Sequence, residues 1–227
     1  MTVDSEGATP ARRRDARRNR ELLVEAAHEV FSEQGLDAPL DVIARRAGVG
    51  NATLYRHFPA RAALIDAVFH DQLAGTMAAG ERARDATDAW AGLTTYLAAV
   101  FTTLAADRGT NDLMTTHVDG VDILQSVHAH NRDTVDLLLR RGREQGTVRA
   151  DVTTEDLLFA LAALGRAVPA LSAAAGPESW RRPLTLFLDG LRASPTAPPL
   201  PSPTLTAGQL AAILEDLGPH RANRPPR

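Results

Sequence analysis

Several side chains that can hydrogen-bond to nucleic acid lie in one short stretch near the N-terminus. The amide of Asn51 suits adenine, whereas the hydroxyl of Thr53 can bond to several bases or to phosphate. The guanidinium of Arg56 can read guanine or remain a solvated surface group. Arg45 and Arg46 fit phosphate contacts or solvent-facing charges better than base readout. These residue types suggest recognition of double-stranded nucleic acid.

Three short predicted helices would position these side chains. Apolar residues recur at three- and four-residue spacing from Asn19 until Gly35, where the first helix should stop. A second helix is expected to begin at Pro39 and to end near Ala47-Gly48-Val49, and a third to cover residues 51–57. Glycine permits the tight turn between them, so that one helix can project into the major groove. The pattern predicts a helix-turn-helix.

The segment LDVIARRAGVGNATLYRHFPARAALIDAVF resembles the N-terminal domain of the TetR family of bacterial transcriptional regulators, over about residues 19–70. Its characteristic pieces are Ile43-Ala44, Ala47-Gly48-Val49, Thr53-Leu54-Tyr55, His57-Phe58-Pro59, and Arg61 followed by Leu64. The resemblance implies a ligand-responsive regulator, usually a repressor, that binds a palindromic operator as a homodimer and is released by a small molecule.

The resemblance also implies a role for the matched apolar positions. Ile43, Leu54 and Phe58 would form the core that holds the two helices together. In one place the sequence departs from the family, which often starts its second helix with a threonine or serine whose hydroxyl touches phosphate. Here the residues are Ala38-Pro39-Leu40, so one phosphate contact is expected to be missing.

The polar positions of the match are the expected DNA contacts. Gly50, Asn51 and Thr53 would lie at the start of the recognition helix and reach base edges or phosphates. The positions that resemble the family's phosphate contacts are Tyr55, His57 and Arg61. The full predicted DNA-binding set is Arg45, Gly50, Asn51, Thr53, Tyr55, Arg56, His57 and Arg61.

A cluster of arginines precedes the motif. Residues 11–20 hold six arginines and one aspartate, a net charge of +5 in a chain whose total is −3. Residues 1–18 are expected to form a disordered arm. This arm is either a solvated tail or a contact with the minor groove or neighbouring phosphates.

Composition limits the other function classes. The chain has 227 residues, 44% of them hydrophobic, and no cysteine, which excludes disulfides, thiolate chemistry and cysteine-based metal sites. With no signal peptide expected, the cytoplasm is the predicted compartment. No glycine-rich phosphate loop, HExxH or nucleophile elbow is present, so no catalytic residue, cofactor or enzyme activity is predicted. His128 and His130 would point about 200° apart on one helix, so no metal site is predicted.

The remainder of the chain is also helical, so the expected fold is all-α. It divides into the arm, a three-helix DNA-binding domain at residues 19–65, a larger ligand-binding and dimerisation domain at 66–193, and a proline-rich tail at 194–227. The apolar stretch Leu157–Ala175 is long enough to cross a membrane, but Arg166 and Pro169 interrupt it. A buried helix is the interpretation, with no membrane partner.

By resemblance, helices near residues 154–175 and 178–191 would form the homodimer interface. The effector pocket would lie among the helices after the DNA-binding domain and would take an apolar or amphipathic small molecule. Its candidate wall residues are Met77, Leu93, Tyr96, Leu97, Met114, His117, Leu138, Phe159 and Arg166. Ligand binding would shift the helix at residues 60–80 and with it the recognition helix. The alternatives are a ligand-binding or scaffold protein of this fold without operator binding, and an all-α enzyme.

Overall fold

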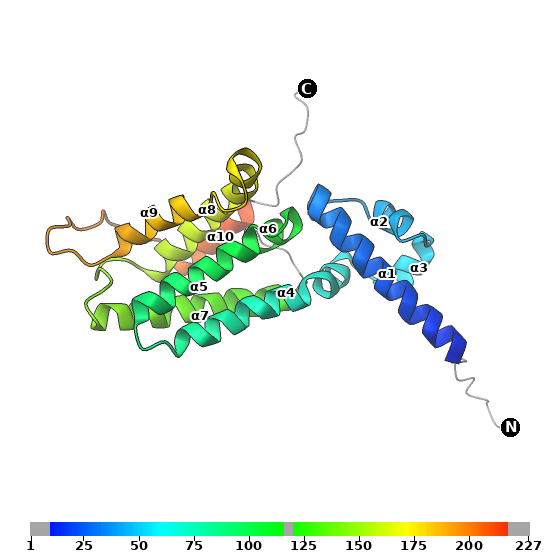
Figure 1. Ribbon diagram of the computed structural model, residues 1–227, viewed down its shortest axis with the longest axis horizontal. Helices are drawn as coiled ribbons and strands as arrows, with labels where there is room; N and C mark the ends of the chain where they lie inside the picture. Colours follow the sequence, from blue (N-terminus) through cyan, green and yellow to red (C-terminus); the bar gives the residue numbers. More distant parts are fainter. Residues whose placement is uncertain (1–9, 116–119, 218–227) are drawn as a thin grey trace.

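The computed structural model describes residues 10–115 and 120–217, and within these ranges the chain forms ten helices and no strand (Figure 1). The helices are α1 (Pro10–Gln34), α2 (Leu40–Arg46), α3 (Asn51–His57), α4 (Arg61–Arg84), α5 (Ala89–Leu104), α6 (Arg108–Thr115), α7 (Asp122–Glu144), α8 (Thr154–Ala175), α9 (Arg181–Leu191) and α10 (Ala207–Leu217). The predicted all-α fold is confirmed.

Local sequence signals set the ends of these helices. Gly35 follows α1 with a φ of +83°, a conformation that favours glycine. The Thr153 side chain accepts a hydrogen bond from the Asp156 backbone N–H, and the Asp156 carboxylate accepts one from the Thr153 backbone N–H. This reciprocal cap starts α8.

Helices α1–α3 form a small domain at one end of the molecule, and α5–α10 form the body at the other (Figure 1). One apolar cluster joins α1–α3 to α4, α6 and the start of α7, and includes a contact between the rings of Phe31 and Phe69 at 6.2 Å. A second cluster lies in the body around Tyr96, Phe101 and Trp180. Helix α4 contributes Phe69 to the first cluster and Ala83 to the second. The expected domain boundary at residues 65–66 therefore falls inside a helix that belongs to both parts.

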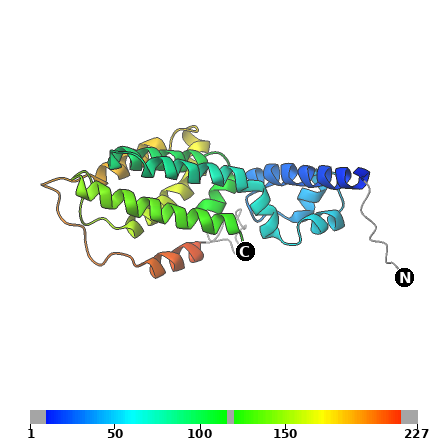
Figure 2. The ribbon, with the colours of Figure 1, turned by 90° about the horizontal axis from the view of Figure 1, so that it is seen from below.

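The expectation of a disordered arm over residues 1–18 is wrong for residues 10–18, which are the first turns of α1. Arginine and alanine are strong helix formers, no glycine or proline interrupts residues 11–34, and proline suits the first helical position. An Arg17–Glu21 ion pair at 3.5 Å adds the favourable i,i+4 spacing. Figure 2 shows α1 as one continuous rod. Residues 1–9 lie outside the described part.

Helix α8 is the one helix of the described ranges that is long and apolar enough to span a membrane by length and composition. In the structure its inner side packs on the body through Leu157, Leu161 and Val168. A β-carbon on Gly165 would stand 3.0 Å from Leu104, so α8 and α5 approach closely there. Only 28% of its most apolar stretch is buried, so α8 packs on the body along one side, and the buried helix that the sequence predicted is not observed within this chain.

Candidate nucleic-acid interface

The turn between α2 and α3 depends on Gly48, whose φ is +68°. The backbone N–H of Gly48 donates to the Arg45 carbonyl at 3.1 Å, and that of Val49 donates to the Ala44 carbonyl at 3.0 Å. These bonds close the end of α2 and turn the chain into α3. Because a side chain at this φ is strained, glycine is required here.

The predicted core of the motif is confirmed. Ile43, Leu54 and Phe58 are 0%, 1% and 2% exposed and pack in the N-terminal cluster. The guanidinium of Arg20 lies 5.2 Å from the centre of the Phe58 ring, which links α1 to the end of α3. Pro39 precedes α2 without a side-chain cap, in line with the missing hydroxyl.

One side of α3 faces solvent. Asn51 and Arg56 are exposed, and Tyr55 is 53% exposed although it is aromatic. Within the described ranges none of the three side chains has a hydrogen-bond partner. Thr53 is half-buried, and a β-carbon on Gly50 would meet nothing within 4 Å, so the start of α3 is open to a partner. These groups form a polar surface that is not used by the fold.

The other basic residues of the motif are engaged by the protein. Arg45 pairs with Asp41 at 3.1 Å on the surface of α2. Arg46 makes two hydrogen bonds to Glu33 of α1, at 2.8 and 2.9 Å, and so serves neither as a bare solvent charge nor as a free phosphate clamp. The hydrogen bond from Arg46 lowers the pKa of Glu33.

Arg61 donates from Nη1 to the Leu36 carbonyl at 2.6 Å, which ties the start of α4 to the loop after α1. A guanidinium has further N–H donors, so this bond leaves a phosphate contact open to Arg61.

His57 is half-buried at the C-terminal end of α3. Burial lowers its pKa, and the nearby charges of Arg56 and Arg20 lower it further. The imidazole is therefore neutral at pH 7, and Nε2 has no partner within the described residues. A phosphate beside it would oppose both causes and favour the protonated form.

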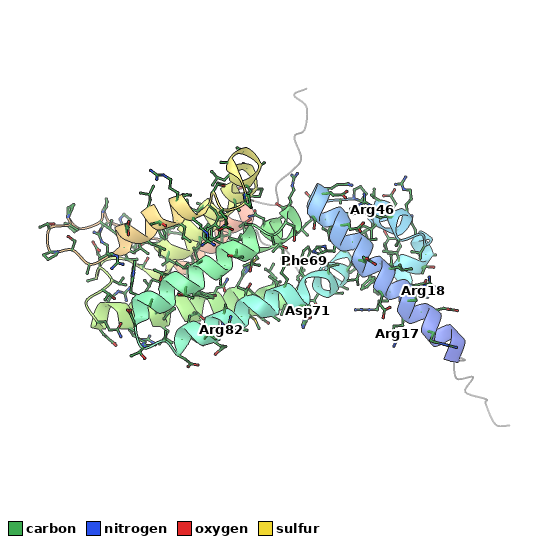
Figure 3. All side chains as sticks on the ribbon, viewed as in Figure 1. Arg17, Arg18, Arg46, Phe69, Asp71 and Arg82 are labelled. Atoms are coloured by element: carbon green, nitrogen blue, oxygen red, sulfur yellow. The ribbon has the colours of Figure 1, made fainter. Side chains whose placement is uncertain are left out.

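The N-terminal end of α1 carries exposed arginines beside this surface. Arg14, Arg17 and Arg18 are exposed, and Figure 3 shows Arg17 and Arg18 on the part of α1 farthest from the body. The proximity of Arg20 to His57 shows that the basic stretch continues to α3. A negatively charged partner would meet both elements.

Comparison with known proteins agrees with this geometry. Residues 23–68 match the family described as "Bacterial regulatory proteins, tetR family", and residues 88–193 match "Transcriptional regulator SbtR-like, C-terminal domain". The TetR transcriptional regulator SCO0520 from Streptomyces coelicolor is 32% identical, with a TM-score of 0.50, over 78% of this chain and 99% of that structure. This chain belongs to the TetR family. It is a DNA-binding transcriptional regulator by family and not an enzyme.

Two further relatives of this TetR protein match less of the sequence or only its fold. HTH-type transcriptional regulators of Staphylococcus aureus are 45% identical over 47 residues, 20% of this chain and 25% of theirs. The similarity therefore spans about a quarter of those curated relatives. FadR from Bacillus subtilis, solved in complex with stearoyl-CoA, shares the fold with a TM-score of 0.58 at 16% identity, over 75% of this chain and 98% of that structure.

The body of the TetR protein holds a cavity of about 230 Å³ between α5, α6, α7, α8 and α10. Aliphatic side chains such as Leu104, Leu158 and Leu161 form most of the wall. A polar strip on α7 adds His128, Asn131 and Arg132, of which Arg132 also pairs with Glu155 at 2.7 Å.

Most of the predicted wall residues lie elsewhere. Met114 lines the cavity, whereas Leu93, Leu97 and Leu138 are fully buried in the body core. Tyr96 is also a core residue, and its hydroxyl donates to Asn131. The remaining candidates are outside the wall as well: Met77 packs on the N-terminal cluster, Phe159 is 39% exposed, Arg166 is half-buried on α8, and His117 lies outside the described residues.

The two neighbouring histidines of α7 occupy different environments. His128 lines the cavity, and His130 packs against Gly80 of α4. The two side chains thus point in different directions from α7, as their spacing on a helix predicted. The sequence predicted no metal site for the pair, and it gave no signal that His128, Asn131 and Arg132 share a cavity.

Proposed function

We propose that this TetR regulator is a repressor that binds a palindromic operator as a homodimer and releases it when a small molecule binds. The exposed side chains of Asn51, Tyr55 and Arg56 on α3, which have no hydrogen-bond partner among the described residues, carry the proposal. A short helix with these groups on one side suits base edges and phosphates in the major groove. Arg45, Thr53, His57 and Arg61 would add contacts at the rim. The cytoplasm is the compartment that such a regulator requires.

Helices α8 and α9 provide the proposed dimer interface. Phe159 of α8 is 39% exposed and Leu186 of α9 is 64% exposed, and alanines fill much of the outer side of α8. A second copy would cover these groups through a twofold axis. Two recognition helices could then read half-sites about 34–36 Å apart.

The cavity is the proposed effector site. Its aliphatic wall and its polar strip on α7 suit an amphipathic small molecule. A signal from the cavity to the DNA would travel through α4, since α4 packs in both apolar clusters. A coupling of about 1–3 kcal/mol would change operator affinity about 5- to 150-fold.

A gel shift with the DNA upstream of the protein's own gene, followed by selection from random duplexes, tests the proposal. Tyr55→Ala and Arg56→Ala should weaken operator binding by about 1–3 kcal/mol each. Arg140→Ala is the matched control, because Arg140 is exposed on α7 and pairs with Asp136 far from α3. If no palindrome is enriched, or if all three variants bind alike, the alternative of a ligand-binding or scaffold protein without operator binding is favoured.

A further inference from the structure

The C-terminal segment after residue 193 lies beyond the stretch that matches the family's C-terminal domain. It leaves the end of α9 as an exposed, proline-containing linker and then forms α10. Figure 2 shows that this linker loops out from the body and brings α10 back alongside it. The segment is therefore an addition to the TetR body that folds onto it.

Hydrogen bonds fix the linker to the turn before α8. Arg149 donates from Nη2 to the Pro198 carbonyl at 2.8 Å, and the Leu200 backbone N–H donates to the Asp151 carboxylate at 2.7 Å. Arg149 and Asp151 also pair with each other at 2.7 Å. The base of the segment is thus anchored by a charged pair whose two members hold the linker.

The helix itself meets the body through apolar side chains. Leu210 is 2% exposed, and it lines the cavity together with Leu214 and two alanines of α10. At the start of α10, the Thr206 backbone N–H donates to the Gln209 side chain, and the Gln209 backbone N–H donates to the Thr206 hydroxyl. These hydrogen bonds lie within the segment and do not tie it to the body. Ala212 faces solvent on the opposite side. Helix α10 is thus an amphipathic helix with its apolar side over the cavity.

With α10 in place, the cavity is small for its proposed use. Its volume of about 230 Å³ is below the range of about 300–1,000 Å³ that is usual for small-molecule sites. An amphipathic molecule that reached His128, Asn131 and Arg132 would need the space that Leu210 and Leu214 now fill. Moving α10 would supply that space without disturbing the helices of the body core.

We propose that α10 is a tethered lid that competes with the effector for the cavity. The inference rests on the proposed effector function of the cavity. The apolar side of α10 occupies the site in the absence of ligand, an apolar ligand displaces it, and the Arg149–Asp151 anchor keeps the displaced helix nearby. The lid thereby sets the effector concentration at which the regulator responds.

The test uses full-length protein without DNA and the probe 1-anilinonaphthalene-8-sulfonate, an aromatic anion that fluoresces in apolar sites. Leu210→Asp places a charge on the docked side of α10, and Ala212→Asp is the matched control on the exposed side. Removing the competitor should tighten probe binding by about fivefold or more in Leu210→Asp and leave it unchanged in Ala212→Asp. Adding Ala162→Trp, which fills the cavity, should abolish that gain.

A second measurement follows the lid directly. The chain has no cysteine, so Leu210→Cys and Ala212→Cys each introduce a single thiol. The thiol at residue 210 should react with Ellman's reagent far more slowly than the one at residue 212, and the probe should accelerate it. This variant leaves α10 uncharged, so it gives an answer even if Leu210→Asp does not fold.

Each outcome has one meaning. The lid alone would be overturned if the probe bound Leu210→Asp no more tightly than wild type, or if the gain survived Ala162→Trp. It would also be overturned if the probe slowed the reaction of the residue-210 thiol or left it unchanged. A probe that binds neither the wild type nor the variants would overturn the proposed effector site as well. Operator binding does not enter the experiment, so its failure would be seen separately in the gel shift.

Discussion

Gly80 of α4 lies so close to the imidazole of His130 on α7 that a β-carbon on Gly80 would overlap Nε2. The same imidazole places Nδ1 3.4 Å from the Glu81 carboxylate. Arg84, one turn further along α4, donates to the His130 carbonyl at 3.3 Å. This contact sets how closely α7 approaches the helix that joins the DNA-binding domain to the body.

Gly80→Ala is expected to destabilise the protein. Alanine favours a helix over glycine by about 0.5–1 kcal/mol, but overpacking a buried contact costs about 1–3 kcal/mol. Gly75→Ala is the matched control on the same helix, because a β-carbon there meets nothing within 4 Å, and it should be neutral or stabilising. Urea unfolding of both variants measures the difference. Adding His130→Ala to Gly80→Ala should remove most of the loss, and equal stability of Gly75→Ala and Gly80→Ala would contradict the packing.

The stability of the protein should fall as the pH drops below 6.5, the ordinary pKa of histidine. Burial lowers the pKa of His130, and Arg84 lowers it further, against the smaller opposing effects of Glu81, Asp133 and a backbone bond to Met77. The unfolded chain therefore binds more protons than the folded protein between pH 6.5 and the lowered pKa, so acidification favours unfolding in this window. Burial acts in the same direction on His57.

The measurement is the free energy of unfolding at several pH values from 7.5 to 5. His130→Gln should show a shallower loss of stability across this window than wild type, because the group that resists protonation is gone. His70→Gln, at an exposed position of α4, is the control and should keep the wild-type slope. Identical slopes in all three proteins would show that His130 does not contribute.

The parts of this fold that the sequence predicted well are those set by local chemistry. Helix α3 has the predicted bounds because Gly50 and Pro59 interrupt the helical pattern on either side. Leu54 and Phe58 are core residues because they lie four residues apart and so share the side that packs in the N-terminal cluster. Helix α1 begins at Pro10, earlier than predicted, because a dense cluster of charge does not by itself prevent arginine and alanine from forming a helix.

The cavity could not be predicted in the same way. Periodicity shows that one side of a helix is apolar, but it does not show whether that side packs on other helices or lines a cavity. Leu93 and Leu138 pack in the body core. The wall also depends on α10, which returns to α8 from beyond a long linker. Such a contact is set by the tertiary fold and leaves no signal in the spacing of residues.

The basic end of α1 should contact phosphates from outside the groove, because it is a helix and not an extended arm that could enter the minor groove. Arg17→Ala and Arg18→Ala should each weaken binding to all duplexes alike, and each should reduce the slope of log affinity against log salt by about 1 for a lost phosphate contact. Arg82→Ala, at the far end of α4 in Figure 3, is the control. A loss confined to one operator sequence, or an unchanged salt slope, would contradict phosphate contact.

Leu186→Arg should separate the proposed homodimer. Burial of a leucine stabilises an association by about 1.5–3 kcal/mol, and a twofold interface repeats the loss, so the dimer dissociation constant should rise at least about a hundredfold. Leu200→Arg is the matched control, because Leu200 is 41% exposed but lies on the linker and not on α8 or α9. Sedimentation equilibrium gives the constants. Since a monomer presents a single α3, operator affinity should fall together with dimerisation in Leu186→Arg, and a Leu186→Arg protein that remains as dimeric as Leu200→Arg would place the interface elsewhere.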